Sequence, residues 1–199
     1  MIINPFWFAA AGAGGVTWNP ADKGADVSLS GGDLTATLTG TVTNTVVRGT
    51  TSHATGVAGK YYFEGVRNST GASYPYLGIC NAALPFTATT GNAAPGVFAV
   101  AGNNFFCYGN GASVNTGQTW ANGDIEMVAV DMATLKIWFG RNGTWFNSGN
   151  PGAGTGQIFT ISADTYFPMV NCRATGVGIT ARFASASWGF AAPSGFVQW

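Results

Sequence analysis

The stretch GDIEMVAVDMATLKIWFGRNGTW, residues 123–145, decides the fold class of this chain. Residues 124–131 and 134–140 are apolar runs rich in β-branched and aromatic side chains, which favour strands. A short linker separates the two runs, and the Asn142-Gly143 pair is typical of a type I′ hairpin turn. The stretch therefore predicts consecutive antiparallel strands.

The second run also predicts which side chains enter a core. Successive side chains of a strand point to opposite faces, so Leu135, Ile137 and Phe139 share one face, and we expect that face to be buried. Lys136 and Trp138 share the other face. Trp138 therefore lies either on an outer surface or under a neighbouring segment.

Strand patterns recur over most of the chain without helical periodicity. Residues 33–39 alternate between apolar side chains and threonines, and no repeat of constant period is visible. We expect an all-β fold, a two-sheet antiparallel β-sandwich, over residues 16–199. Its further strands are expected at residues 42–48, 60–66, 74–80, 96–101, 104–109, 157–161, 165–170 and 178–183.

The composition excludes several classes of partner. Of 199 residues, 46% are hydrophobic and only 8% are charged, and the formal net charge is zero. A chain with this charge lacks the basic surface that nucleic acid requires, and it lacks the basic cluster that binds an anionic membrane. Every apolar run is too short for membrane insertion. So few charges favour association over repulsion, which indicates either a subunit of a larger assembly or a neutral secreted domain.

Residues 1–15, MIINPFWFAAAGAGG, differ from the rest of the chain. The glycines make a helix unfavourable, and the segment lacks the basic start of a secretory signal. We interpret it as an apolar N-terminal arm whose Phe6, Trp7 and Phe8 anchor the domain to another protein of the same assembly or to a symmetry-related copy. The alternative is a first strand that packs on its own domain.

Neither a disulfide framework nor a metal site is expected. Cys80, Cys107 and Cys172 are odd in number, far apart and placed in apolar runs, which is typical of buried free thiols that fold in a reducing compartment. His53 has no Cys or carboxylate at ligand spacing, so we predict no metal. We predict no cofactor either, since the Gly cluster at 12–15 lacks the Lys-Ser/Thr of a phosphate loop.

The order of several short motifs resembles the SPRY domain, a concanavalin-like β-sandwich of jelly-roll type that serves recognition. The resemblance covers roughly residues 17–198, and the stretch from Trp120 to residue 145 is its most specific part. The matching motifs are GKYYFE (59–64), LGI (77–79), W-x-x-GD with the strand pair at 120–145, YFP (166–168), Phe183 and PSGF (193–196).

The Gly-rich stretch at residues 143–156 departs from the animal members and resembles SPRY-type domains of phage and bacterial proteins. This resemblance implies a non-enzymatic phage virion protein, in the capsid, a head fibre or the tail, that folds in the bacterial cytoplasm before assembly. Two alternatives remain open. One is a lectin that binds a host receptor or carbohydrate through the same rim loops, and the weaker one is a glycoside hydrolase of concanavalin-like fold.

The resemblance places ligand binding in loops at one rim of the sandwich. Arg48, in the segment VVRG, matches a position that contributes to the peptide pocket of some members. Exposed Tyr and Trp with one Arg are common in protein-binding hot spots, and aromatic faces also stack on sugar rings. The alternative is that these aromatic residues only fill the sandwich. The candidate ligand-binding residues are Arg48, Tyr74, Tyr76, Trp145 and Phe146.

Catalysis is not expected. Retaining glycoside hydrolysis needs two carboxyl groups about 5–5.5 Å apart across the sugar bond. The nearest pair, Asp124 and Glu126, points to the same face of one predicted strand, whereas Asp131 faces the opposite side. Asp124 also falls on the G-D position of the family, where a carboxylate satisfies backbone N–H groups of a turn.

Overall fold

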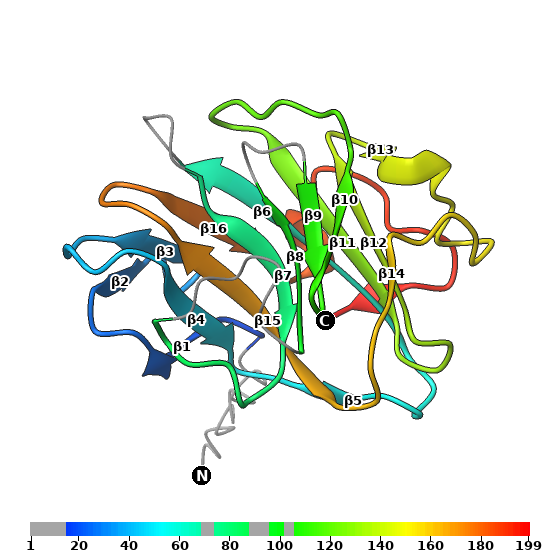
Figure 1. Ribbon diagram of the computed structural model, residues 1–199, viewed down its shortest axis with the longest axis horizontal. Coiled ribbons are helices and arrows are strands. Elements are labelled where there is room, and N and C mark those ends of the chain that lie inside the picture. The colour runs from blue at the N-terminus through cyan, green and yellow to red at the C-terminus, as the bar shows by residue number, and fades with distance from the viewer. Residues whose placement is uncertain (1–14, 69–73, 88–95, 102–105) are drawn as a thin grey trace, which may run out of the picture.

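The computed structural model describes residues 15–68, 74–87, 96–101 and 106–199, which form two antiparallel sheets packed face to face (Figure 1). Sheet A has the order β1 (Trp18–Lys23), β4 (Thr45–Gly49), β15 (Thr165–Cys172), β7 (Tyr76–Cys80), β8 (Val97–Ala101), β9 (Phe106–Gly109), β10 (Ala112–Asn115), with β5 (His53–Ala54) beside β15. Sheet B has the order β13 (Thr144–Trp145), β12 (Lys136–Arg141), β11 (Ile125–Asp131), β6 (Lys60–Asn68), β16 (Gly178–Arg182), β3 (Thr35–Leu38), β2 (Val27–Ser30), with β14 (Phe159–Thr160) beside β12 and β17 (Val197–Gln198) parallel to β6. Single turns of 3-10 helix, η1 (Phe146–Ser148) and η2 (Ser185–Ser187), follow β13 and β16. The predicted all-β two-sheet sandwich is confirmed.

The stretch at 123–145 folds as its pattern predicts. Strands β11 and β12 pair antiparallel with Val128 opposite Phe139. Asn142 and Gly143 both have positive φ, 47° and 84°, as a type I′ turn requires. The Asn142 side chain also accepts a hydrogen bond from the Ile125 amide at 2.8 Å, which ties the turn to the start of β11.

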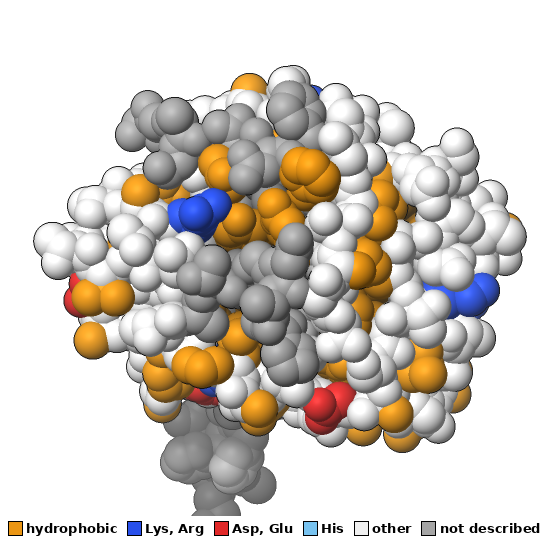
Figure 2. All heavy atoms as spheres, in the orientation of Figure 1, with side chains coloured by type: hydrophobic (Ala, Val, Ile, Leu, Met, Phe, Trp, Pro, Cys, Tyr) orange, Lys and Arg blue, Asp and Glu red, His pale blue; other side chains and the backbone are white. Residues whose placement is uncertain are grey.

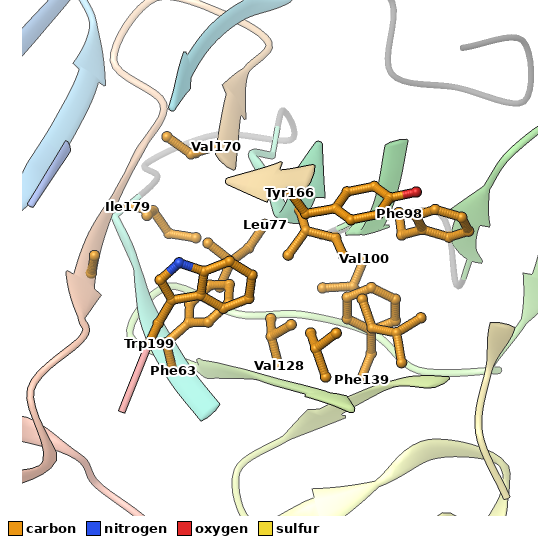
Figure 3. Packing of buried hydrophobic residues seen from close by; sticks show 14 of the residues in the cluster. Phe63, Leu77, Phe98, Val100, Val128, Phe139, Tyr166, Val170, Ile179 and Trp199 are labelled. Carbon is orange, nitrogen blue, oxygen red and sulfur yellow. The ribbon is translucent and has the colours of Figure 1, made fainter. Parts of the chain in front are cut away.

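The core lies between the inner faces of the two sheets. Ile137 and Phe139 are fully buried in it, as the alternation predicts, whereas Leu135 lies at the turn before β12 and is half-buried. Cys80, Cys107 and Cys172 are free and buried. Figure 3 shows side chains of the two sheets pointing toward one another: Phe63, Val128 and Phe139 from sheet B, and Leu77, Val100 and Tyr166 from sheet A.

The outer face of sheet B is covered by the C-terminal tail, which we define as residues 184–196. Trp138 lies under this tail, so the second of its two predicted positions is the one observed: its ring packs 6.2 Å from that of Phe196, and both are buried. Glu64, also buried on this face, accepts hydrogen bonds from the Gly189 amide at 2.7 Å and the Phe190 amide at 2.9 Å. The tail is therefore fixed to sheet B by both packing and a buried carboxylate.

Candidate functional site

The five residues predicted to bind a ligand do not form one site. Tyr74 and Tyr76 lie together at the start of β7 in sheet A, whereas Trp145 belongs to the edge strand β13 of sheet B. Arg48 is on β4 in sheet A and Phe146 begins η1. The structure brings together only the two tyrosines.

Arg48 is buried and holds a loop in place. Its Nη1 atom lies 2.6 Å from Oδ1 of Asp22, and its other guanidinium nitrogens donate to the carbonyl oxygens of Asn81, Ala82 and Leu84. The guanidinium also lies 5.2 Å from the centre of the Phe86 ring. The guanidinium therefore binds residues 81–86, and because Arg48 is only 4% exposed it offers no open surface to a ligand.

Phe146 differs from its neighbour Trp145 in exposure. The Phe146 ring is 5% exposed and belongs to the main core, where it makes an edge contact with Trp120 at 6.1 Å. Its ring therefore offers no open face to a ligand, as the alternative prediction of a core role requires. Trp145 is half-buried.

The two predicted tyrosines surround an arginine that sequence reasoning missed. Arg173, directly after β15, donates from Nη1 to the Tyr74 hydroxyl at 3.2 Å and to the Tyr76 hydroxyl at 2.9 Å. Its Nε donates to Oδ1 of Asn44 at 3.1 Å. The guanidinium carbon lies 5.2 Å from the Tyr74 ring centre and 5.4 Å from that of Tyr76. These contacts fix the cation over aromatic faces.

The aromatic row continues across sheet A. The Tyr108 ring lies 5.7 Å from that of Tyr76 and 6.0 Å from that of Phe106. Figure 2 shows hydrophobic side chains gathered over the middle of this face, between residues drawn in grey, with a basic side chain beside them. We call the set Arg173, Tyr74, Tyr76, Phe106 and Tyr108 the Arg173 surface. Tyr76 is buried within it, so Tyr74, Phe106 and Tyr108 supply its accessible aromatic area.

The charge of Arg173 is not neutralised by a carboxylate in the described part of the chain. The ion pairs found there join Arg48 to Asp22, Lys60 to Asp131, Arg141 to Asp124 and Arg182 to Glu64. Arg173 instead has neutral oxygen partners, and burial raises the pKa of Tyr76 to about 12, so that hydroxyl remains neutral. The Arg173 surface therefore combines apolar area with one positive charge that is half-exposed.

The carboxylates Asp124 and Glu126 are not arranged as a catalytic pair. Asp124 accepts from the Ala121 amide at 2.6 Å and from Nδ2 of Asn142 at 2.8 Å, and it pairs with Arg141, so it performs the turn role expected of the G-D position. Burial acts to raise the pKa of Asp124, but the Ala121 and Asn142 hydrogen bonds and the Arg141 cation together hold it below the usual range. Glu126 is fully buried on the inner face of β11 and has no surface that faces a substrate.

The described residues contain no group of three His, Cys, Asp or Glu side chains placed to hold a metal ion. His53 stacks on Tyr61 with ring centres 3.7 Å apart and also contacts Trp199, and burial lowers its pKa. Its role in this structure is packing. No helix in the described ranges is both long and apolar enough to span a membrane.

Several solved SPRY domains have this fold. The SPRY domain of human HERC1 has a TM-score of 0.61 and 15% identity, with 83% of this chain and 96% of that chain covered. The TRIM65 PSpry domain has a TM-score of 0.64 and 16% identity over 84% and 91% of the two chains, and a human SPRY domain has 0.57 and 16% over 79% and 94%. No family model and no curated protein matches the sequence. The chain therefore has the SPRY fold, and these structures do not show the predicted similarity to phage proteins.

Proposed function

We propose that this chain is a non-enzymatic binding domain that recognises a protein partner through the Arg173 surface. The observation that carries the proposal is Arg173, a half-buried residue whose guanidinium lies on tyrosine rings and has no carboxylate beside it among the described residues. An arginine forks two parallel hydrogen bonds to a carboxylate, and its planar group is pre-organised for that contact. The Nη2 atom of Arg173 makes no hydrogen bond in the described residues, so it remains available to a partner.

The chemistry of the surface defines the partner. Arginine and tyrosine are enriched in the energetic centres of protein interfaces, and the tyrosine rings provide rigid apolar area around the cation. A peptide segment with an acidic side chain beside an aromatic or aliphatic one fits this arrangement. The carboxylate pairs with Arg173 while the apolar side chain packs on Tyr74 or Tyr108.

We further propose that the domain is a structural or attachment component of a phage virion. It folds in the bacterial cytoplasm and is joined to other virion proteins or to symmetry-related copies through Phe6, Trp7 and Phe8. These three residues lie outside the described residues, so the support comes from the sequence: 8% charged residues, zero net charge and an aromatic segment before a Gly-rich stretch. A nearly uncharged chain associates more readily than a charged one.

Selection from a random-peptide display library tests the recognition surface. We expect enriched peptides to carry Asp or Glu near an apolar residue, and Arg173→Ala to weaken their binding about tenfold or more, since charge-assisted hydrogen bonds contribute about 1.5–3 kcal/mol. Arg173→Lys should restore only part of the affinity, because lysine lacks the planar fork. Lys23→Ala, which removes a positive charge elsewhere on sheet A, serves as the matched control. Peptides that bind Arg173→Ala and the parent protein equally would place recognition elsewhere.

Deleting residues 1–15 tests the anchoring segment. We expect the truncated protein to remain folded with an unchanged melting temperature and to be absent from purified particles, whereas the full chain is incorporated. Copy number in those particles separates a capsid position, with hundreds of copies, from a tail position with a handful. Loss of the folded sandwich on truncation, or incorporation without the segment, contradicts the anchoring role.

A further inference from the structure

An open pocket lies away from the Arg173 surface, at the edge of sheet B. It measures about 660 Å³, which is within the range of about 300–1,000 Å³ for small-molecule sites. In Figure 1 the loop after β13 and the C-terminal tail lie side by side, and both contribute to it. The lining residues are Trp145, the loop residues 148–153 and the tail residues Pro193 and Ser194.

We propose that this pocket binds one unit of a neutral carbohydrate, with Trp145 stacking on the apolar face of the sugar ring. A pyranose ring presents C–H groups on its faces and hydroxyl groups at its edge. Trp145 is half-buried and lines the pocket, so part of its aromatic surface is open to a ring of this kind. No charged side chain lines the pocket, which favours a neutral sugar over an acidic one.

The polar groups of the lining suit sugar hydroxyls. Ser148 and Ser194 are exposed, and their hydroxyls make no hydrogen bond within the described residues. Oδ1 of Asn150 accepts from the Ala153 amide at 3.1 Å, which leaves its Nδ2 group as a donor. Serine hydroxyls both donate and accept, and an amide donates through its nitrogen, so together they match the mixed donors and acceptors of a sugar edge.

The indole of Trp145 is held in position from behind. Its ring makes an edge contact with the buried Tyr62 ring at 6.1 Å. It also lies over Gly140, the residue opposite Trp145 across the β12–β13 pair. A Cβ at Gly140 would come 2.7 Å from the Thr144 carbonyl oxygen and 3.1 Å from Cε3 of Trp145, so a larger residue would displace β13 and with it the indole.

The loop that forms the opposite wall is equally fixed. Trp138 donates from Nε1 to the Thr155 carbonyl at 2.8 Å, and Lys136 donates to the Gly154 carbonyl at 2.7 Å. At the neck of the loop a Cβ on Gly156 would come 2.7 Å from Cα of Gly149, so the two glycines allow the chain to close. A wall that is already ordered does not lose further conformational entropy when a ligand binds.

The backbone just before the pocket is strained. Asn147 and Ser148 have φ of 54° and 51°, a left-handed conformation that non-glycine residues adopt at a cost. Such residues persist where the surrounding structure forces them, and they occur often at ligand-binding loops. Across this turn Phe146 lies in the core and Ser148 lines the pocket.

Binding to an array of neutral and acidic glycans tests the proposal, with the affinity of any positive glycan then measured by titration. We expect neutral glycans to bind, and Trp145→Ala to lower the affinity about tenfold or more, since the aromatic contact is lost. Trp145 also packs on Tyr62, so a second variant that leaves that contact intact is needed. Ala153→Trp fills the pocket from an exposed position, and Ala133→Trp, at an exposed turn outside the pocket, is its matched control.

The outcomes separate this site from the protein-binding surface. Arg173→Ala should leave glycan binding unchanged, and Ala153→Trp should leave selected peptides bound to the Arg173 surface. The proposal is wrong if no neutral glycan binds, if a glycan binds Ala153→Trp as well as the parent protein, or if the pocket takes a proline-rich peptide instead of a sugar.

Discussion

Glu64→Ala is expected to cost about 3–5 kcal/mol of folding free energy, the range for removing one partner of a buried ionic network. The Glu64 side chain is fully buried and receives the Tyr62 hydroxyl at 2.7 Å as well as the amides of Gly189 and Phe190. Arg182 approaches its second oxygen at 3.5 Å. The substitution leaves a buried hydroxyl and two N–H groups without their acceptor.

Urea unfolding measures this loss, and limited proteolysis of residues 184–196 shows whether the tail is released. Glu64→Gln is the matched control, since it keeps the shape and one acceptor oxygen and should cost less than Glu64→Ala. A loss below about 1 kcal/mol for Glu64→Ala, with the tail still protected, would show that packing alone holds the tail.

Glu126→Gln, in contrast, is expected to increase the free energy of unfolding at neutral and alkaline pH. Glu126 lies on β11, opposite Gly65 of β6, yet its side chain enters the core. Neither carboxyl oxygen has a hydrogen-bond partner within the described residues. Burial therefore raises the pKa of Glu126 well above its ordinary value, Arg67 lowers it and Asp124 raises it further. The folded protein keeps the proton of Glu126 where the unfolded chain has released it.

This difference fixes the direction of the pH dependence. Between the ordinary glutamate pKa and the raised one the folded state binds more protons, so stability decreases as pH rises through that interval. Each pKa unit corresponds to about 1.4 kcal/mol. Glutamine does not ionise, so Glu126→Gln should match the parent protein near pH 4 and exceed its stability at pH 8.

Chemical unfolding at a series of pH values checks this expectation. The difference between variant and parent cancels the contribution of other groups, including His53, whose lowered pKa makes acid destabilising. Burial, and to a smaller extent the nearby charge of Glu126, raises the pKa of the Cys107 thiol on β9 well above its usual value, so this thiol stays neutral over this range. A difference that stays constant with pH would mean that Glu126 is ionised in the folded state.

The local sequence pattern was sufficient to predict the strands, but it was not sufficient to predict which residues form the candidate site. The pair β11–β12 and its Asn142-Gly143 turn follow from alternation and turn chemistry alone, because both depend on residues adjacent in the chain. The Arg173 surface depends instead on β15 lying beside β7, a pairing between segments far apart in sequence. No periodicity in either segment indicates that Arg173 meets Tyr74 and Tyr76.

The other predicted site residues differed from the structure because their positions depend on tertiary contacts, which the alternation of side chains along a strand does not reveal. Arg48 matched a ligand position by resemblance, but the 81–86 segment covers it. Trp145 and Phe146 are adjacent, yet only Phe146 enters the main core, whereas Trp145 packs against Tyr62 on the outer face of sheet B. The tail at 184–196 carries no strand pattern, so its cover over sheet B could not be predicted.

That cover has a consequence for synthesis on the ribosome. The tail follows every strand that it covers in chain order, so β6, β11 and β12 are made before it. At ordinary translation rates the last segment takes on the order of a second to be made. During that time Tyr62, Met127 and Trp138 have no cover from the tail, and the nascent chain presents an apolar sheet face to chaperones or to other nascent chains. Synonymous codons that slow translation of residues 184–196 would lengthen this exposure without changing the folded protein.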